Sequence, residues 1–369
     1  MLSSIRNASK MCWNLTSFIH SSVCNETDQT QISVLPEQPS FDKVYRLVTT
    51  ILFSAILVAS LVGNSLVVFT ILRQRSMKTP CNYFIMNIAL AELGVGLIAA
   101  PLRILEIFTS WPFGYFMCRF LWPIQDVFVC VSVLTHTAIG LERYRAIVKP
   151  FNLKISLRKT RVSIIILWLG CYGASGIPQS FLLELSEVMP GRRMCLLQWP
   201  SQVFRRCYIA YLVLVFIMVP LAVQTCCYIK IITVLNRKRE FGASARIVFK
   251  NSDEHERQKQ NKRRLIRMLL TSLVVFQLCY LPRGTLMVAL EFQPVEVIRS
   301  SQTIAYAELI FLVLYYCKHV VNPVILFLMS ADFRKAFVAG VTECAGKPDH
   351  SLFSQRESIG PESLQETSV

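Results

Sequence analysis

The stretch IAYAELIFLVLYYCKHVVNPVILFLM, Ile304–Met329, is mostly apolar. A helix of about 20 residues crosses the roughly 30 Å hydrocarbon core of a membrane, so this stretch predicts a membrane span. Lys318 and His319 interrupt it near its middle. An ionisable group inside a membrane is costly and usually has both a partner and a function. The fold therefore depends on finding further spans, and the chemistry of the interior depends on finding that partner.

Six other apolar blocks of similar length precede this one. The chain is 53% hydrophobic with a mean hydropathy of +0.45, and its apolar residues are concentrated in blocks, unlike those of a soluble domain. These blocks predict an all-α membrane protein, a seven-transmembrane helix bundle over residues 44–329. The seven blocks are Val44–Leu72, Cys81–Phe108, Phe116–Ile139, Val162–Leu183, Tyr208–Ile232, Leu265–Leu290 and Ile304–Met329.

The distribution of basic residues predicts the orientation. With the N-terminus outside, the three inner loops contain 22 lysines and arginines, and the outer segments contain fewer. Cytoplasmic loops carry such an excess, so we expect a multi-pass plasma-membrane protein with an extracellular N-terminus. The net charge of +16 is then an orientation signal and an attraction to anionic lipid of the inner leaflet. We expect no nucleic-acid partner, because there is no soluble basic domain to bind one.

The segments on either side of the bundle are polar. Residues 1–43 are expected to form an extracellular glycosylated tail without an apolar stretch of signal-peptide type, so the first span should direct insertion. Its glycosylation sequons are at Asn7, Asn14 and Asn25. Residues 330–344 predict a short amphipathic helix on the membrane surface, and residues 345–369 predict a disordered cytoplasmic tail.

Cysteines and the C-terminus suggest further modifications and partners. Cys344 is a candidate palmitoylation site at the inner membrane surface. The last residues, ETSV, resemble a PDZ ligand, although such short patterns also arise by chance. Cys118 and Cys195 lie at the outer ends of their regions, in an oxidising compartment. Cys12 and Cys24 are also outside, and the sequence leaves open whether they pair.

Several ordered motifs within residues 44–340 resemble the rhodopsin-like family of G-protein-coupled receptors. They are GNSLV at Gly63–Val67, NIALAEL at Asn87–Leu93, WPFG at Trp111–Gly114 followed by Cys118, LERYRAIVKP at Leu141–Pro150, FQLCYLP at Phe276–Pro282 and Asn322-Pro323. The resemblance implies a disulfide between Cys118 and Cys195, a heterotrimeric G protein and arrestin as partners, and a set of switch residues. These are Glu142, Arg143, Tyr144, Tyr228, Phe276, Tyr280, Pro282, Asn322 and Pro323.

Within this family the sequence is similar to peptide receptors. Amine receptors have an aspartate in the third span where this chain has Gln125, and Gln125 together with CYLP and IPQS resembles the orexin and neuropeptide FF group. We therefore expect a neuropeptide ligand. A mixed-sign outer cavity would suit a peptide with a charged side chain and a carboxamide end. The candidate residues are Gln125, Asp126, Arg283, Arg103, Glu106, Glu291 and Glu308. Alternatively, several of them are charges at the rim of the cavity that stay in water.

The polar groups at the midplane are unusual for this family. The position matching Glu92 is usually aspartate and helps to hold a sodium ion, and the position matching Lys318 is usually small and polar. Because the two residues lie at similar depth, we hypothesise that the Lys318 ammonium replaces the sodium ion as the partner of Glu92. Alternatively, Lys318 reaches towards water or is neutral. The expected central polar core consists of Asn64, Glu92, Ser132, Lys318 and His319.

Other departures concern the switch residues. His136 replaces an apolar residue, with Ser272 as its expected neighbour, and Leu326 replaces the tyrosine of the NPxxY motif. Tyr280 stands where the family usually has tryptophan, and Arg143 keeps only Glu142 beside it. We expect altered basal signalling, with its direction open, unless other contacts in the bundle compensate.

Three other functions compete with that of a signalling receptor. An opsin would have its retinal lysine at Tyr316, nearly on the opposite helix face from Lys318. A transporter or channel using Glu92, Lys318 and His136 would be expected to show internal repeats or broken helices, which are absent from the sequence. A receptor-like peptide scavenger or arrestin-biased receptor, without efficient G-protein coupling, stays open because of Leu326. No pattern predicts an enzyme, a cofactor or a metal site.

Overall fold

The computed structural model describes residues 39–99, 101–102, 104–105, 109–149, 155–189, 192–245, 253–293 and 302–344. Several expectations lie outside these residues. They concern the glycosylation sites, Cys12 and Cys24, the cavity candidates Arg103 and Glu106, and the tail after residue 344.

Seven apolar helical segments long enough to cross a membrane form the body of the protein, as predicted. Three of the seven consist of consecutive helical pieces. The helices are α3 (Pro39–Arg73), α4 (Pro80–Gly94) continued by η3 (Val95–Ala99), α6 (Gly114–Val148), α7 (Leu157–Cys171) with η4 (Tyr172–Gly176) and α8 (Ile177–Leu182), α9 (Gln202–Val213) with η5 (Leu214–Met218) and α10 (Val219–Ala245), α11 (Asp253–Glu291) and α13 (Gln302–Met329).

Three of the helix starts are explained by local sequence. A hydroxyl side chain at an N-cap accepts a hydrogen bond from a backbone N–H of the first turn, which would otherwise have no partner. Thr79 caps α4, Ser156 caps α7 and Ser201 caps α9 in this way. Pro80, directly after Thr79, occupies the first helical position, where its missing N–H costs nothing.

Each of the three π-helical turns lies just before a proline. The turns η3, η4 and η5 end two residues before Pro101, Pro178 and Pro220. A proline inside a helix lacks a donor, and its ring clashes with the carbonyl four residues earlier. In all three cases that carbonyl belongs to the π turn, where the wider backbone accommodates the ring.

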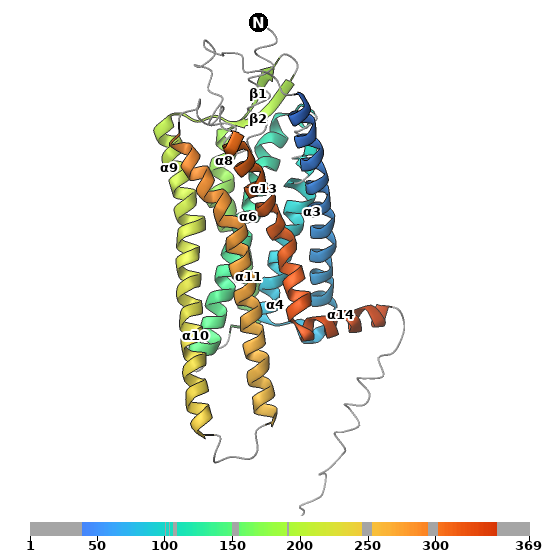
Figure 1. Ribbon diagram of the computed structural model, residues 1–369, viewed down its shortest axis with the longest axis vertical. Coiled ribbons are helices and arrows are strands. Elements are labelled where there is room, and N and C mark those ends of the chain that lie inside the picture. Colours follow the sequence, from blue (N-terminus) through green and yellow to red (C-terminus); the bar gives the residue numbers. More distant parts are fainter. Residues whose placement is uncertain are drawn as a thin grey trace, which may run out of the picture.

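The helices stand side by side, and the other elements mark the two ends of the bundle (Figure 1). The antiparallel strands β1 (Leu183–Met189) and β2 (Arg192–Leu197) lie at one end, called the hairpin end. The short helix α14 (Ala331–Cys344) and a 3₁₀ turn, η2 (Arg75–Met77), lie at the other, called the α14 end. α14 runs across the bundle axis, whereas α10 and α11 project beyond the other helices. The hairpin was not predicted.

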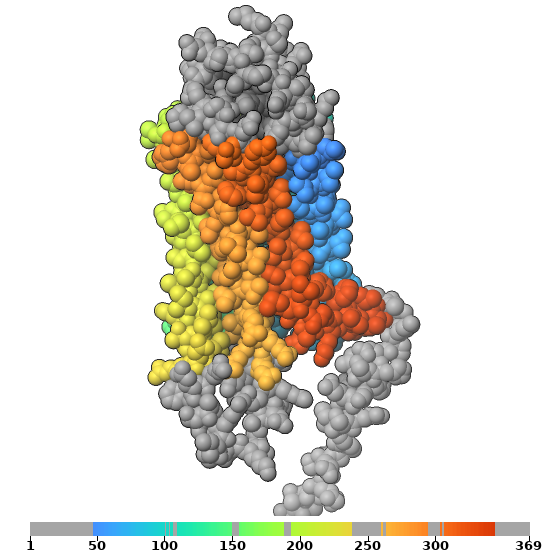
Figure 2. Space-filling model, viewed as in Figure 1, coloured from blue at the N-terminus to red at the C-terminus, as the bar shows by residue number. Residues whose placement is uncertain are grey.

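Close packing of α3 against α13 depends on a glycine. A β-carbon at Gly63 would lie 2.8 Å from Cγ of Pro323, closer than real side-chain contacts allow. The GNSLV motif therefore brings the first span against the proline of the seventh. Figure 2 shows α11, α13 and α3 forming adjacent columns on one face of the molecule. Large apolar side chains such as Ile166, Leu214 and Leu328 are more than half exposed there and elsewhere around the bundle, as expected for contact with lipid.

Candidate functional site

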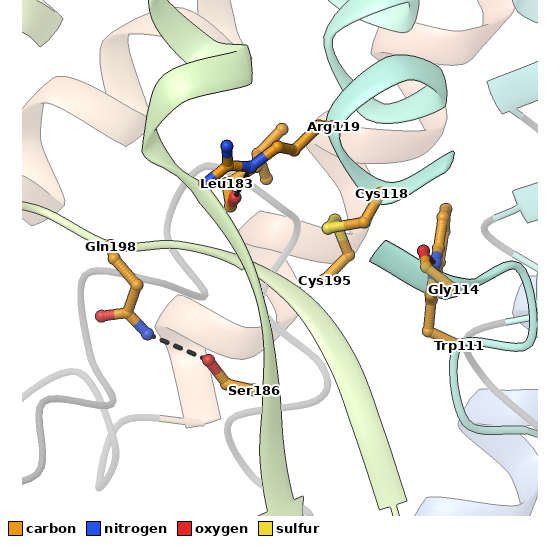
Figure 3. The surroundings of a disulfide bond; sticks show 8 residues. All are labelled: Trp111, Gly114, Cys118, Arg119, Leu183, Ser186, Cys195 and Gln198. Atoms are coloured by element: carbon orange, nitrogen blue, oxygen red, sulfur yellow. Dashed lines mark hydrogen bonds between the residues drawn. A yellow bond between two sulfur atoms is a disulfide. The ribbon is translucent and has the colours of Figure 1, made fainter. Parts of the chain in front are cut away.

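A disulfide between Cys118 and Cys195 ties the hairpin to the start of α6, which confirms the pairing that the family resemblance implies (Figure 3). Arg119, the next residue, donates from Nε to the carbonyl of Leu183 at 3.0 Å. The backbone N–H of Trp111 donates to the carbonyl of Arg193 at 2.8 Å. The hairpin is therefore attached to the bundle on both strands.

A cavity of about 1090 Å³ opens between the spans near the hairpin end and is called the hairpin-side cavity. Ligand sites typically combine a mainly apolar lining with a few placed polar groups, and this cavity has that composition. Its polar and ionisable lining residues include Gln125, Asp126, Ser175, Gln179, Tyr280, Arg283, Tyr315 and Tyr316. Three of the predicted ligand-binding residues, Gln125, Asp126 and Arg283, are therefore brought together.

Asp126 is held in place by a residue that sequence reasoning did not select. Gln179 donates from Nε2 to Oδ2 of Asp126 at 2.8 Å, and its side chain is fully buried. Gln179 belongs to the IPQS stretch. In the sequence this stretch indicated only a resemblance to peptide receptors. Within the described part of the chain, Nε2 of Gln125 is buried without a hydrogen-bond partner. An unpaired buried donor costs free energy, so a ligand that accepts from it gains affinity.

Two predicted cavity acids lie elsewhere. Glu291, at the end of α11, is buried and paired with Arg205 of α9, whose Nη2 lies 2.7 Å from Oε1 of Glu291. Arg206 approaches the same oxygen at 3.9 Å from the surface. Neither Glu291 nor Glu308 is among the residues that line the hairpin-side cavity. Glu308 is buried within electrostatic range of Arg283.

Glu92 is fully buried at the centre of the bundle, and its two oxygens have different partners. The hydroxyl of Ser132 on α6 donates to Oε1 at 2.6 Å. Nδ1 of His319 on α13 contacts Oε2. Asn64 on α3 donates from Nδ2 to the backbone carbonyl of His319 at 2.9 Å, which fixes the helix at that point. Four of the five predicted polar-core residues thus form one connected group.

Lys318 does not pair with Glu92, so that hypothesis was wrong. Successive residues of a helix point about 100° apart, and in α13 it is His319 that faces the carboxylate. Nζ of Lys318 lies instead among three aromatic rings, 5.2 Å from the centre of Phe276, 5.3 Å from Tyr280 and 4.7 Å from Tyr315. The sequence predicted the depth of Lys318 along the helix correctly. It did not show how the helix is rotated about its axis.

The group around Glu92 does not fit a sodium ion. Oε1 accepts from Ser132 and Oε2 contacts Nδ1 of His319, so a cation at the carboxylate would have to compete with these two partners for space. The imidazole of His319 stands where a cation would approach Oε2. An internal side chain therefore satisfies the acid, as the sequence suggested, although the side chain is a different one.

A smaller cavity of about 470 Å³ lies nearer the α14 end. Its lining includes the switch candidates Tyr228, Asn322 and Pro323, together with His136 and Leu326. His136 packs on the ring of Phe276, with ring centres 4.6 Å apart. Ser272 lines the same cavity, but its hydroxyl donates to Oδ1 of Asn322 at 2.7 Å.

The acidic-Arg-aromatic motif lies near the α14 end of α6. Nε of Arg143 lies 2.5 Å from Oε2 of Glu142, as expected from their adjacency. Nζ of Lys230 on α10 lies 5.8 Å from the ring centre of Tyr144. On α11, the rings of Phe276 and Tyr280 stack with centres 5.8 Å apart, one turn before Pro282. The switch candidates therefore connect the floor of the hairpin-side cavity to the α14 end.

A buried amide network was missed by sequence reasoning. Gln277 on α11 donates to Oε1 of Gln224 on α10 at 3.0 Å. Gln224 in turn donates to the hydroxyl of Thr137 on α6 at 2.7 Å. The available signal was the occurrence of both glutamines inside apolar blocks. This network joins three spans at mid-depth.

Comparisons with known proteins agree with these observations. The model of the seven-transmembrane receptor (rhodopsin family) matches residues 63–326. Neuropeptide FF receptor 2 of Rattus norvegicus is 30% identical over 300 residues, covering 78% of this chain and 70% of that protein. The pyroglutamylated RF-amide peptide receptor of the same species is 27% identical over 329 residues, covering 86% and 74%.

A third relative and a solved structure extend this picture. The QRFP-like peptide receptor of Branchiostoma floridae is 28% identical over 308 residues, covering 81% of this chain and 79% of that protein. The crystal structure of squid rhodopsin superposes with a TM-score of 0.69 at 21% identity, covering 93% of this chain and 97% of that one, and shows the same fold. The predicted multi-pass bundle is confirmed. The chain therefore belongs to the rhodopsin family of seven-transmembrane receptors.

Proposed function

We propose that this protein is a plasma-membrane receptor for an extracellular neuropeptide, with the hairpin end outside and the α14 end in the cytoplasm. The disulfide at the hairpin end supports this orientation, because disulfides persist in oxidising compartments. The matched relatives are named as receptors for neuropeptide FF, RF-amide and QRFP-like peptides. A receptor of this family would pass ligand binding to a heterotrimeric G protein.

The observation that carries the proposal is the hairpin-side cavity with three convergent polar residues. Gln125, Asp126 and Arg283 come from two different spans and line one space of about 1090 Å³. In this proposal Gln125 binds an amide or carbonyl of the peptide. Asp126 and Arg283 bind its charged groups. Arg103, Glu106, Glu291 and Glu308 are secondary candidates for binding the peptide.

The inner half supports the transmission step. Glu142, Arg143 and Tyr144 lie near the α14 end of α6, and the small cavity beside them is lined by Tyr228 and the Asn322-Pro323 pair. We assign these residues to G-protein coupling and the switch, together with Phe276, Tyr280 and Pro282. Arrestin, lipid at the basic inner loops, palmitate at Cys344 and a PDZ protein at the C-terminus remain part of the proposal.

The experiment is a screen of a neuropeptide library, including peptides ending in Arg-Phe-amide, against cells that express the receptor. Ligand-dependent nucleotide exchange on a G protein is the readout. Gln125→Ala and Arg283→Ala should each weaken an active peptide by about tenfold or more, which corresponds to about 1.4 kcal/mol. Gln198→Ala and Arg206→Ala, at the hairpin end but outside the cavity lining, are the matched controls.

Three outcomes would count against this proposal. Unchanged affinity in both cavity variants would remove Gln125 and Arg283 from the site. Peptide binding and uptake without nucleotide exchange would favour the scavenger or arrestin-biased receptor, an alternative that Leu326 in the inner cavity lining keeps relevant. The absence of any peptide ligand, with coupling intact to another agonist class, would overturn the peptide assignment.

A further inference from the structure

We propose that Lys318 is the anchor of an anion-binding subsite beneath the hairpin-side cavity, and that this subsite takes a carboxylate of the ligand. The inference deepens the proposed function, because it rests on that cavity being the ligand site. It predicts that the natural ligand carries an acidic group next to an apolar or aromatic group.

The first observation is a buried lysine amine without a contacting anion. The side chain of Lys318 is 1% exposed, and in the part of the chain that the structure describes its Nζ has no hydrogen-bond partner. Its neighbours are the rings of Phe276, Tyr280 and Tyr315 at 4.7 to 5.3 Å. The negative faces of aromatic rings attract an ammonium, but they offset only part of the cost of removing it from water. An anion bound beside Nζ of Lys318 would offset the rest of that cost.

The second observation is that the acids closest in depth are already engaged. Oε1 of Glu92 accepts from the hydroxyl of Ser132, and Oε2 contacts Nδ1 of His319. Asp126 lies within electrostatic range of Lys318, but its Oδ2 accepts the hydrogen bond from Gln179 at 2.8 Å. The protein thus places an ammonium at its centre and directs its own carboxylates to other donors.

The third observation is that the cage also forms part of the cavity wall. Tyr280 and Tyr315 line the hairpin-side cavity and at the same time lie over Nζ of Lys318. A change of side-chain rotamer at either tyrosine would connect the ammonium to the cavity. The lining around them is apolar and includes Val129, Phe216 and Leu312. A carboxylate on an aromatic or aliphatic group matches this combination of one cation and apolar walls.

The subsite is separate from Arg283. Arg283 lies three residues beyond Tyr280 in α11, one helical turn nearer the hairpin end. It lines the cavity and is within electrostatic range of Glu308. A ligand can therefore use Arg283 at an upper level and Lys318 at the floor.

The test uses purified receptor in nanodiscs with two small probes, 3-phenylpropionate and its uncharged counterpart 3-phenylpropionamide, at equal millimolar concentrations. Binding to the folded state raises the midpoint of thermal unfolding. We expect the carboxylate to raise it by about 2–4 °C and the amide by less than half as much. The difference between the two probes should vanish in Lys318→Met and persist in Lys318→Arg and Arg283→Met.

Each probe difference is measured against the unliganded midpoint of the same variant, so a general loss of stability does not affect it. Lys318→Gln, which keeps a polar group without the charge, is the second variant if methionine at this position does not fold. Equal effects of carboxylate and amide on the wild type would overturn the proposal without any variant. A carboxylate effect that survives Lys318→Met but is lost in Arg283→Met would overturn it as well.

The same probes separate this inference from the proposed function. Carboxylate binding that depends on Lys318, with no peptide agonist in the library screen, would leave the subsite in place and contradict the peptide assignment. An active peptide whose potency is unchanged by Lys318→Met, together with no carboxylate preference in the probe assay, would do the reverse.

Discussion

Nδ1 of His319 contacts Oε2 of Glu92 across 227 residues of sequence, so the midplane acid is satisfied by an imidazole of the last span. The hydroxyl of Ser132 donates a hydrogen bond to the other oxygen, Oε1. We predict that sodium has no specific effect on the purified receptor. Its unfolding midpoint should be the same, within about 1 °C, in sodium chloride and in choline chloride at equal ionic strength.

The variant His319→Ala frees Oε2 of Glu92 and leaves room for a cation, so a stabilising effect of sodium should appear. Lys318→Ala is the control, since Lys318 makes no contact with Glu92 and its removal should not create sodium dependence. A clear stabilisation of the wild type by sodium would contradict the arrangement.

Gly63→Ala should destabilise the protein by about 1–3 kcal/mol, because the new methyl group would lie 2.8 Å from Cγ of Pro323. Gly170→Ala on α7 is the matched control, since a β-carbon there meets nothing within 4 Å. Thermal unfolding followed by tryptophan fluorescence measures both. Equal midpoints for the two variants would mean that α3 and α13 do not meet closely at this point.

Gln277→Leu removes the side-chain N–H that donates to Oε1 of Gln224, a hydrogen bond between α11 and α10. A buried acceptor left without a partner costs about 1–3 kcal/mol, so the variant should be less stable. The proposed function adds a second readout, basal nucleotide exchange on a G protein, which the loss of this contact between α11 and α10 should change.

The double variant Gln224→Leu with Gln277→Leu replaces both partners by apolar groups of similar size. It should recover part of the lost stability, since no polar group of that pair then lacks a partner, although the hydrogen bond from Gln224 to Thr137 is also lost. Additive losses in the two single variants and the double variant would show that the hydrogen bond at 3.0 Å makes no independent contribution.

Arg205→Met should destabilise the hairpin end by about 3–5 kcal/mol, because Glu291 would stay buried without its close partner. Arg206→Met should cost less than about 1 kcal/mol, since that side chain is half exposed and lies 3.9 Å from the same oxygen. Thermal unfolding of both variants provides the comparison. Adding Glu291→Met to Arg205→Met should restore stability, and failure to do so would assign the loss to packing alone.

Much of the fold could be predicted because a membrane imposes long apolar segments. All seven spans, the helix after the last one and the Cys118–Cys195 disulfide follow from block length or from motifs. The hairpin was missed because it is a short loop whose form depends on its attachment to α6. The π turns were missed because a proline in an apolar block signals a distortion without specifying its type.

The site was predicted to the level of helix depth. Depth follows from counting residues, and it correctly brought Gln125, Asp126 and Arg283 to one cavity. Rotation about the helix axis is set by packing against neighbours, which a single sequence does not reveal. That is why Lys318 was assigned the partner that His319 has, and why Glu291 was not connected to Arg205.

The wide turns before Pro101, Pro178 and Pro220 have a consequence for transferring knowledge between receptors. A π turn contains an additional residue relative to a regular helix, so every side chain beyond it is rotated by about 100°. A position equated with one in a relative that lacks the turn would then face lipid in one protein and the interior in the other. Comparisons of ligand-binding positions between receptors in the hairpin-end halves of these three spans should therefore use superposed structures in place of a sequence alignment.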